Sequence, residues 1–174
     1  GVIGFFVGND AGTIIKPVWI QPSSSNPVTF SVDFNGVTHS DWQDCGTGLD
    51  HITEQDYYYI NRITGTEDAK VAIEWHPDTH PQGLIQYGVN DLSSIVLAHY
   101  DGSQWLPVTS TLSGSGGSGS ATTTSGRVTS SMALSSFSPF TLGSTNSNNP
   151  FQQFLLDPKT YVPDDNFEAY LETH

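Results

Sequence analysis

The stretch Thr29-Phe30-Ser31-Val32-Asp33-Phe34 alternates apolar and polar residues, so that Phe30, Val32 and Phe34 share one face. A period of two residues is typical of a β-strand that turns one face toward a core. The stretch Lys70-Val71-Ala72-Ile73-Glu74-Trp75 repeats the pattern with an apolar face of its own. These two stretches predict half-buried strands, and therefore a fold in which sheets enclose the core.

Further strand candidates cover most of the chain before residue 143, and turn residues separate them. Together with the two stretches above, they give about nine expected strands. The further candidates are Val2–Val7, Thr13–Gln21, Tyr57–Ile63, Ser94–Tyr100, Gln104–Val108, Val128–Leu134 and Phe137–Leu142. Asp101-Gly102 between two apolar segments predicts a hairpin. No segment before residue 150 has helical periodicity with caps, which excludes the crossover helices of a parallel sheet. We predict an all-β protein, an antiparallel Ig-like β-sandwich over residues 1–143.

Three segments differ from the strands in composition. The serine- and glycine-rich stretch 113–125 is typical of a flexible surface loop. Residues 144–159 are predicted as a polar linker. Residues 160–174 are predicted as a short helical tail, the start of a following domain, because Asp165 and Glu168 have the spacing of a helix-capping pair. Such a short helix needs a docking partner in its own chain or in a neighbouring copy.

The charge balance excludes two classes of partner. Asp and Glu total 18 against 5 Lys and Arg, which gives a formal net charge of -13. A surface this acidic disfavours nucleic acid and anionic lipid, which both need cations, whereas it is compatible with calcium. No apolar run approaches the roughly 20 residues of a membrane span, so no direct membrane insertion is expected.

The single cysteine, Cys45, excludes an intramolecular disulfide and is interpreted as a bystander thiol. The chain opens on GVIGFFVG, without Met and without a basic segment before an apolar one. We therefore expect it to be cut from a longer polypeptide.

Four stretches resemble a β-sandwich module of secreted and cell-surface proteins of Bacteroidetes that the type IX secretion system exports. They are GFFVGNDAGTIIKPVWI (4–20), YYYINRITGTEDAKVAIEW (57–75), which is similar to a strand pair of the module, LSSIVLAHYDGSQW (92–105) and SSFSPFTLGS (135–144). The resemblance implies a sandwich fold and a secreted or cell-surface location. Its motifs are structural, so they specify the fold more than any activity.

The tail carries a separate resemblance, because TYVPDDNFEAYLE (160–172) is similar to the start of leucine-rich-repeat segments in the same proteins. The two resemblances imply a non-enzymatic structural or adhesive module of a large extracellular protein, one that can build filaments. Its expected partners are neighbouring domains or copies of the same protein. The alternative is a carbohydrate-binding module attached to a secreted hydrolase, with glycans as partners.

A first candidate metal site lies in the acidic stretch after the strand at 29–34. Asp41, Asp44 and Asp50 can offer carboxylate oxygens to calcium, the hard cation that prefers such ligands. The spacing lacks the alternating pattern of a calcium loop. The competing interpretation is an acidic loop at the edge of the sandwich.

A second candidate metal site lies in the stretch Glu74 to His80. His76, Asp78 and His80 can converge on zinc or another transition metal if the loop folds back. Two prolines nearby rule out the helix that would align the two imidazoles, so the competing interpretation is a solvated loop.

Trp42 and Tyr58 are the candidate glycan-binding residues. Trp42 lies in a polar stretch, and Tyr58 alternates with Tyr57 and Tyr59, so one of the two phases must face outward. Ring packing in the core or at an edge is the competing interpretation.

Enzymatic motifs are missing from the sequence. It has no GxSxG, HExxH, phosphate-binding or dinucleotide-binding pattern. We expect no enzymatic activity and no resident cofactor, with calcium as the one ion to test.

Overall fold

The computed structural model describes residues 1–8, 15–76, 78–80, 83–86, 88–151 and 154–156, with residues 78–80, 83–86 and 154–156 described by their backbone alone. The fold is all-β, as the alternation predicted, and every strand pairing between named strands is antiparallel. The helical tail predicted at 160–174 lies outside the described residues. Within them, no helix has the length and apolar character needed to cross a membrane.

Two large sheets and one small sheet make up the structure. The five-stranded sheet has the order β1 (Ile3–Gly8), β2 (Ile15–Pro22), β6 (Ala69–Trp75), β12 (Gly126–Ser130), β11 (Ser110–Ser113). The six-stranded sheet has the order β10 (Trp105–Val108), β9 (Ile95–Tyr100), β13 (Pro139–Ser144), β5 (Tyr57–Thr64), β3 (Thr29–Asn35), with β4 (His51–Ile52) beside β13. The three-stranded sheet has the order β14 (Phe154–Leu156), β8 (Gly83–Gln86), β7 (Asp78–His80). Two short 3₁₀ turns, η1 (Leu92–Ser94) and η2 (Ser115–Gly117), complete the elements.

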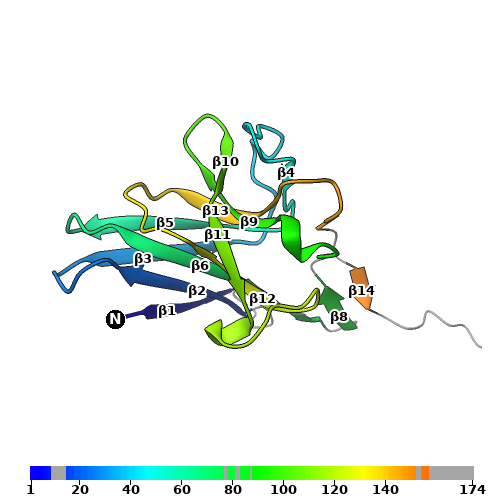
Figure 1. The fold of residues 1–174 in the computed structure, drawn as a ribbon, viewed down its shortest axis with the longest axis horizontal. Helices are drawn as coiled ribbons and strands as arrows, with labels where there is room; N and C mark the ends of the chain where they lie inside the picture. The colour runs from blue at the N-terminus through cyan, green and yellow to red at the C-terminus, as the bar shows by residue number, and fades with distance from the viewer. Residues whose placement is uncertain (9–14, 77, 81–82, 87, 152–153, 157–174) are drawn as a thin grey trace, which may run out of the picture.

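The chain passes repeatedly between the two large sheets. In Figure 1, β1, β2 and β12 lie below the strands β5, β13 and β10 of the six-stranded sheet. The hairpin β9–β10 turns at Asp101-Gly102 as predicted, and Gly102 takes the positive φ of 100° that the turn requires. The stretches at 57–63 and 69–75, which resemble a strand pair, form β5 and β6, and these belong to different sheets.

Side chains from both large sheets meet in one core. The alternating residues Val71, Ile73 and Trp75 of β6 point inward with no exposed area, and Ile60 and Phe140 come from the six-stranded sheet with none either. Burying each large apolar side chain contributes about 1.5–3 kcal/mol. The period of two therefore fixes which face of each sheet meets the other.

A second, smaller apolar cluster covers the outer face of the six-stranded sheet. It contains Leu49, Ile52, Ala98 and Trp105, and Trp42 is among the half-buried residues that pack against it. Residues 36–50 supply this cover, since β3 ends at Asn35 and the chain crosses the face before β4. This segment carries three residues of the candidate site, His39, Ser40 and Asp41.

The serine- and glycine-rich stretch 113–125 is held against the five-stranded sheet. The Ser115 hydroxyl and the Gly116 N–H donate to the Glu74 carboxylate at 2.6 and 3.0 Å. Arg127 Nε donates to the same carboxylate at 2.8 Å, and Glu74 is only 3% exposed. Burial would raise the pKa of Glu74, but these hydrogen bonds outweigh it and lower the pKa. A sequence that is typical of a flexible loop is therefore pinned by one buried carboxylate.

The fold continues past residue 143, where the predicted linker begins. Ser144 ends β13, and Asn149 and Phe151 are buried at 0% and 2% exposed. The Asn149 side chain accepts from the N–H groups of Asn90 and Asp91, both at 2.7 Å. It also donates to the Asp91 carbonyl and to the hydroxyls of Ser94 and Ser144. We refer to Asn149 and these hydrogen-bond partners as the Asn149 cluster. The cluster joins the segment after β13 to the body of the protein.

One ion pair joins the two large sheets inside the protein. Lys16 Nζ of β2 lies 4.0 Å from Asp56 Oδ2, next to β5, and the two side chains are 2% and 5% exposed. Lys16 alternates in phase with the buried Val18, and Asp56 with the buried Tyr58. Both charged groups therefore point into the space between the sheets.

Candidate functional site

An open hollow beside the outer cluster gathers aromatic and acidic side chains. Its volume is about 480 Å³. Four segments of the chain line it, namely residues 39–41, Tyr59 of β5, the β9–β10 turn from Tyr100 to Gly102, and residues 136–139. We refer to it as the Tyr59 hollow. It lies where the covering segment 36–50 leaves part of the sheet open.

Ring contacts hold the aromatic side chains of this region in fixed positions. The buried imidazole of His39 contacts the rings of Tyr57, Tyr100 and Trp105, with ring centroids 4.8 to 5.1 Å apart. Tyr57 in turn contacts Tyr59 edge-on at 5.4 Å. Tyr59 is 38% exposed, so it presents ring surface to solvent while its neighbours fix it from behind.

Hydrogen bonds orient the carboxylates at the hollow. The Tyr100 hydroxyl donates to Asp41 Oδ2 at 2.9 Å, which together with burial raises the pKa of Tyr100. Asp101 Oδ1 accepts from the Ser103 hydroxyl and from the N–H groups of Ser103 and Gln104. These bonds lower the pKa of Asp101 and keep it ionised. The hollow therefore has two fixed negative charges.

The Ser138–His99 pair at the rim is the arrangement closest to a nucleophile and base. His99 Nε2 lies 2.6 Å from Ser138 Oγ, and the Ser138 hydroxyl also contacts the Tyr100 carbonyl. A carbonyl only accepts, so the Ser138 hydroxyl uses its one hydrogen to donate to the Tyr100 carbonyl. His99 Nε2 must then donate to Ser138 Oγ. A catalytic base must accept the proton of the nucleophile, so this geometry favours a structural role.

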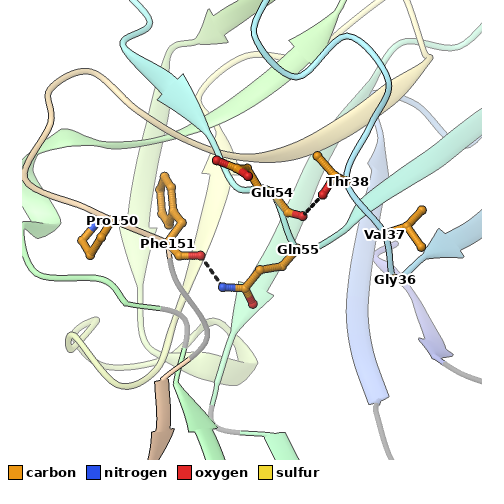
Figure 2. A pocket seen from close by; sticks show the side chains of 7 residues that line it. All are labelled: Gly36, Val37, Thr38, Glu54, Gln55, Pro150 and Phe151. Carbon is orange, nitrogen blue, oxygen red and sulfur yellow. Dashed lines mark hydrogen bonds between the residues drawn. The ribbon is translucent and has the colours of Figure 1, made fainter.

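A second hollow, of about 580 Å³, lies at the other side of the segment 36–50. Figure 2 shows its seven lining residues, among them Thr38, Gln55 and Phe151. The Thr38 hydroxyl donates to the Glu54 carbonyl at 2.6 Å, and the Gln55 amide donates to the Phe151 carbonyl. The polar side chains of this hollow are therefore hydrogen-bonded to neighbouring backbone carbonyls. The hollow lies where the chain after β13 packs against the rest of the fold.

The family of this chain is not shown by a match to a known protein. Comparison with protein-family models, with curated proteins and with solved structures finds no match for this chain.

The three acidic residues predicted to bind calcium do not converge. Among the described residues, no group of three or more His, Cys, Asp or Glu side chains could hold a metal ion. Asp41 accepts from Tyr100, Asp50 Oδ2 lies 2.8 Å from His51 Nδ1, and Asp44 is exposed. The calcium hypothesis for Asp41, Asp44 and Asp50 therefore stays a prediction.

The predicted transition-metal site stays a prediction. His76 follows β6 directly, and Asp78 and His80 lie two residues apart in β7. The side chains of Asp78 and His80 lie outside the described residues, so their direction is open.

The two predicted glycan-binding residues occupy different places from those expected. Tyr58 is 1% exposed and belongs to the core, which leaves no ring face for a ligand. Trp42 is half-buried against the outer cluster and is not among the residues that line the Tyr59 hollow. The alternation was correct in period, but Tyr59 rather than Tyr58 faces outward. Tyr100 and Asp101 were also missed, since only the hairpin places them near Tyr59.

We expect the stability to fall as the pH is lowered below about 6.5. Burial lowers the pKa of both His39 and His99 from the ordinary value of 6.5, although Asp41 and Asp101 respectively oppose it. As the pH falls, these two histidines bind protons in the unfolded chain at a higher pH than in the folded chain. The free energy of unfolding is therefore largest above pH 6.5 and decreases as the pH falls through the folded pKa values. Urea midpoints measured between about pH 8 and about pH 5 test this. The variant His99→Gln should show a flatter profile, and a wild-type midpoint that rises toward acid pH would contradict the assignment.

Proposed function

We propose that this chain is a non-enzymatic structural or adhesive module of a large bacterial cell-surface or extracellular protein, built as an Ig-like β-sandwich. Two large antiparallel sheets around a shared core support the sandwich architecture. The resemblance of the strand motifs to modules of secreted Bacteroidetes proteins supports the location. The acidic, lysine-poor surface is compatible with it.

The observation that carries the proposal is the placement of the first and last described strands. Figure 1 shows the start of β1 at the left end of the body and β14 at the right end. Modules joined in series need the chain to enter and leave at opposite ends. The Asn149 cluster and Phe151, whose N–H donates to the Gly88 carbonyl at 3.3 Å, hold the chain at the end where it leaves.

We expect antibodies raised against this chain to label intact cells of the organism that encodes it. Protease added outside the cells should remove the labelling, because a surface module is accessible without permeabilisation. An antibody against a cytoplasmic protein, which should label only permeabilised cells, is the control. Labelling of the chain only after permeabilisation would overturn the proposed location.

The non-enzymatic part of the proposal has its own measurement. The chain should leave chromogenic esters and peptides intact, because the Ser138 hydroxyl donates its hydrogen bond to the Tyr100 carbonyl instead of to His99. Turnover that is lost in Ser138→Ala would show that the Ser138–His99 pair is catalytic and would reject the proposal.

A further inference from the structure

We propose that the Tyr59 hollow binds an uncharged glycan through Tyr59, Asp41 and Asp101. The inference deepens the proposed function, because an adhesive module needs a ligand and this hollow supplies a site for one. A sugar ring has apolar C–H faces and a rim of hydroxyl groups. A matching site needs an exposed ring face, fixed hydrogen-bond acceptors and enough open volume for a sugar to enter.

The ring face comes from Tyr59. Tyr59 is 38% exposed as a residue, and its ring contacts Tyr57 edge-on, which the His39 contact fixes in turn. A ring whose position is set before binding loses little conformational freedom when a sugar packs on it. The aromatic π-face is negative, and it attracts the weakly positive C–H groups of a sugar face.

The acceptors come from the two carboxylates. Hydrogen bonds hold Asp41 through Tyr100 and hold Asp101 through its own turn, so neither carboxylate has to be ordered by the ligand. All described contacts of Asp101 use Oδ1, which leaves Oδ2 as an acceptor for a ligand hydroxyl. An ionised carboxylate makes stronger hydrogen bonds with hydroxyl donors than a neutral acceptor does.

The polar rim matches hydroxyl groups better than it matches a cation. Ser40 and Ser136 line the hollow, and a hydroxyl both donates and accepts, as sugar hydroxyls do. A cationic side chain would gain energy from the carboxylates and from the negative face of the Tyr59 ring. It could only donate to the rim hydroxyls, whereas a sugar hydroxyl also accepts from them. The Asp41 side chain is 41% exposed, and ion pairs in such solvated positions contribute little.

Size and charge narrow the ligand class. A hollow of about 480 Å³ is within the range of small-molecule sites and accommodates a short oligosaccharide segment. The two carboxylates, within a chain of net charge -13, repel uronic acids, sialic acid and phosphate. The site therefore selects neutral sugars.

The test is calorimetric titration of the 174-residue chain with neutral oligosaccharides from glucans, mannans, xylans and galactans. At least one should bind, and Tyr59→Ala should weaken that binding about tenfold or more. Ile63→Ala is the matched control, because Ile63 is also exposed on β5 but lies outside the lining. Tyr59→Phe, which keeps the ring, should retain most of the affinity. Thermal unfolding of each variant confirms that it is folded.

A second pair of variants separates a direct contact from a general charge effect. Asp101→Asn should weaken binding. The amide oxygen of asparagine can still accept the hydrogen bonds within the turn, but an NH₂ group replaces the carboxylate oxygen that would accept from the ligand hydroxyl. Asp44→Asn removes the same charge from the covering segment without touching the lining, and should bind as the wild type does.

Three outcomes would overturn the inference. They are no binding of any neutral oligosaccharide, binding that Tyr59→Ala leaves unchanged, and binding of a lysine-rich peptide alone, which would assign the hollow to a cationic partner. Each leaves the cell-labelling result untouched, so failure of the glycan site can be told apart from failure of the proposed function.

Discussion

Replacing Asn149 by leucine is expected to lower the free energy of unfolding by about 3 kcal/mol or more. The change removes the fully buried amide oxygen that accepts from the N–H groups of Asn90 and Asp91, and each such loss costs about 1–3 kcal/mol. Asn149→Asp should also be strongly destabilising, since it places a carboxylate oxygen against the Asp91 carbonyl, to which Nδ2 now donates and which cannot donate in return. Urea unfolding followed by tryptophan fluorescence measures both effects.

The matched control is Asn148→Ala, one residue earlier in the same polar stretch. Asn148 is exposed, and its described side-chain contact is with Asp91 at 3.4 Å, so the change should stay within about 0.5 kcal/mol. If Asn149→Leu and Asn148→Ala shift the urea midpoint equally, the segment after β13 does not fold together with the sheets.

Breaking the Lys16–Asp56 pair is expected to have the second large effect. Lys16→Met leaves a buried carboxylate, and Asp56→Asn leaves a buried ammonium, in the space between the sheets. Removing one partner of a buried ion pair typically costs about 3–5 kcal/mol, because water cannot replace the lost opposite charge in the protein interior. Equilibrium unfolding of each single variant measures this loss.

The double variant Lys16→Met/Asp56→Asn distinguishes pairing from simple packing. With both charges removed, the loss should be smaller than the sum of the two single losses by about 1 kcal/mol or more. Asp68→Asn is the control, because the Arg62–Asp68 ion pair has a similar distance of 3.9 Å but the Asp68 side chain is 47% exposed. This substitution should lower the free energy of unfolding by less than about 1 kcal/mol. Additive single losses would show that the two charges do not stabilise each other.

The strand pattern could be predicted because it depends on local alternation. All nine predicted strands have a counterpart, and the Asp101-Gly102 hairpin was found from its turn residues. Pairing between distant strands was harder to predict. β5 and β6 follow each other within five residues, yet they belong to different sheets, because local sequence does not specify which distant strand supplies the partner.

The candidate site was predicted only in part, because its residues meet through long-range contacts. Asp41 was singled out for calcium, whereas the structure gives it a hydrogen bond from Tyr100, 59 residues away. The phase of β5 was misjudged for a local reason. Tyr58 and Ile60 share a face with Arg62, and Tyr59 and Ile63 share the other face with Asn61. Neither face of the strand is therefore purely apolar in sequence.

The contacts of Glu74 have a consequence for anyone who wishes to tag or split this protein. Loops rich in glycine and serine are the usual choice for inserting an epitope or moving the termini. An insertion between Ser115 and Gly116 would separate two of the donors that hold the Glu74 carboxylate, and so would disturb a buried group beneath the loop. The exposed residues 123 and 124 lie farther along the same stretch and leave that carboxylate untouched. They also come after the Thr122 carbonyl, which accepts from the buried Trp75 indole at 3.1 Å, and so are the safer part of the loop to open.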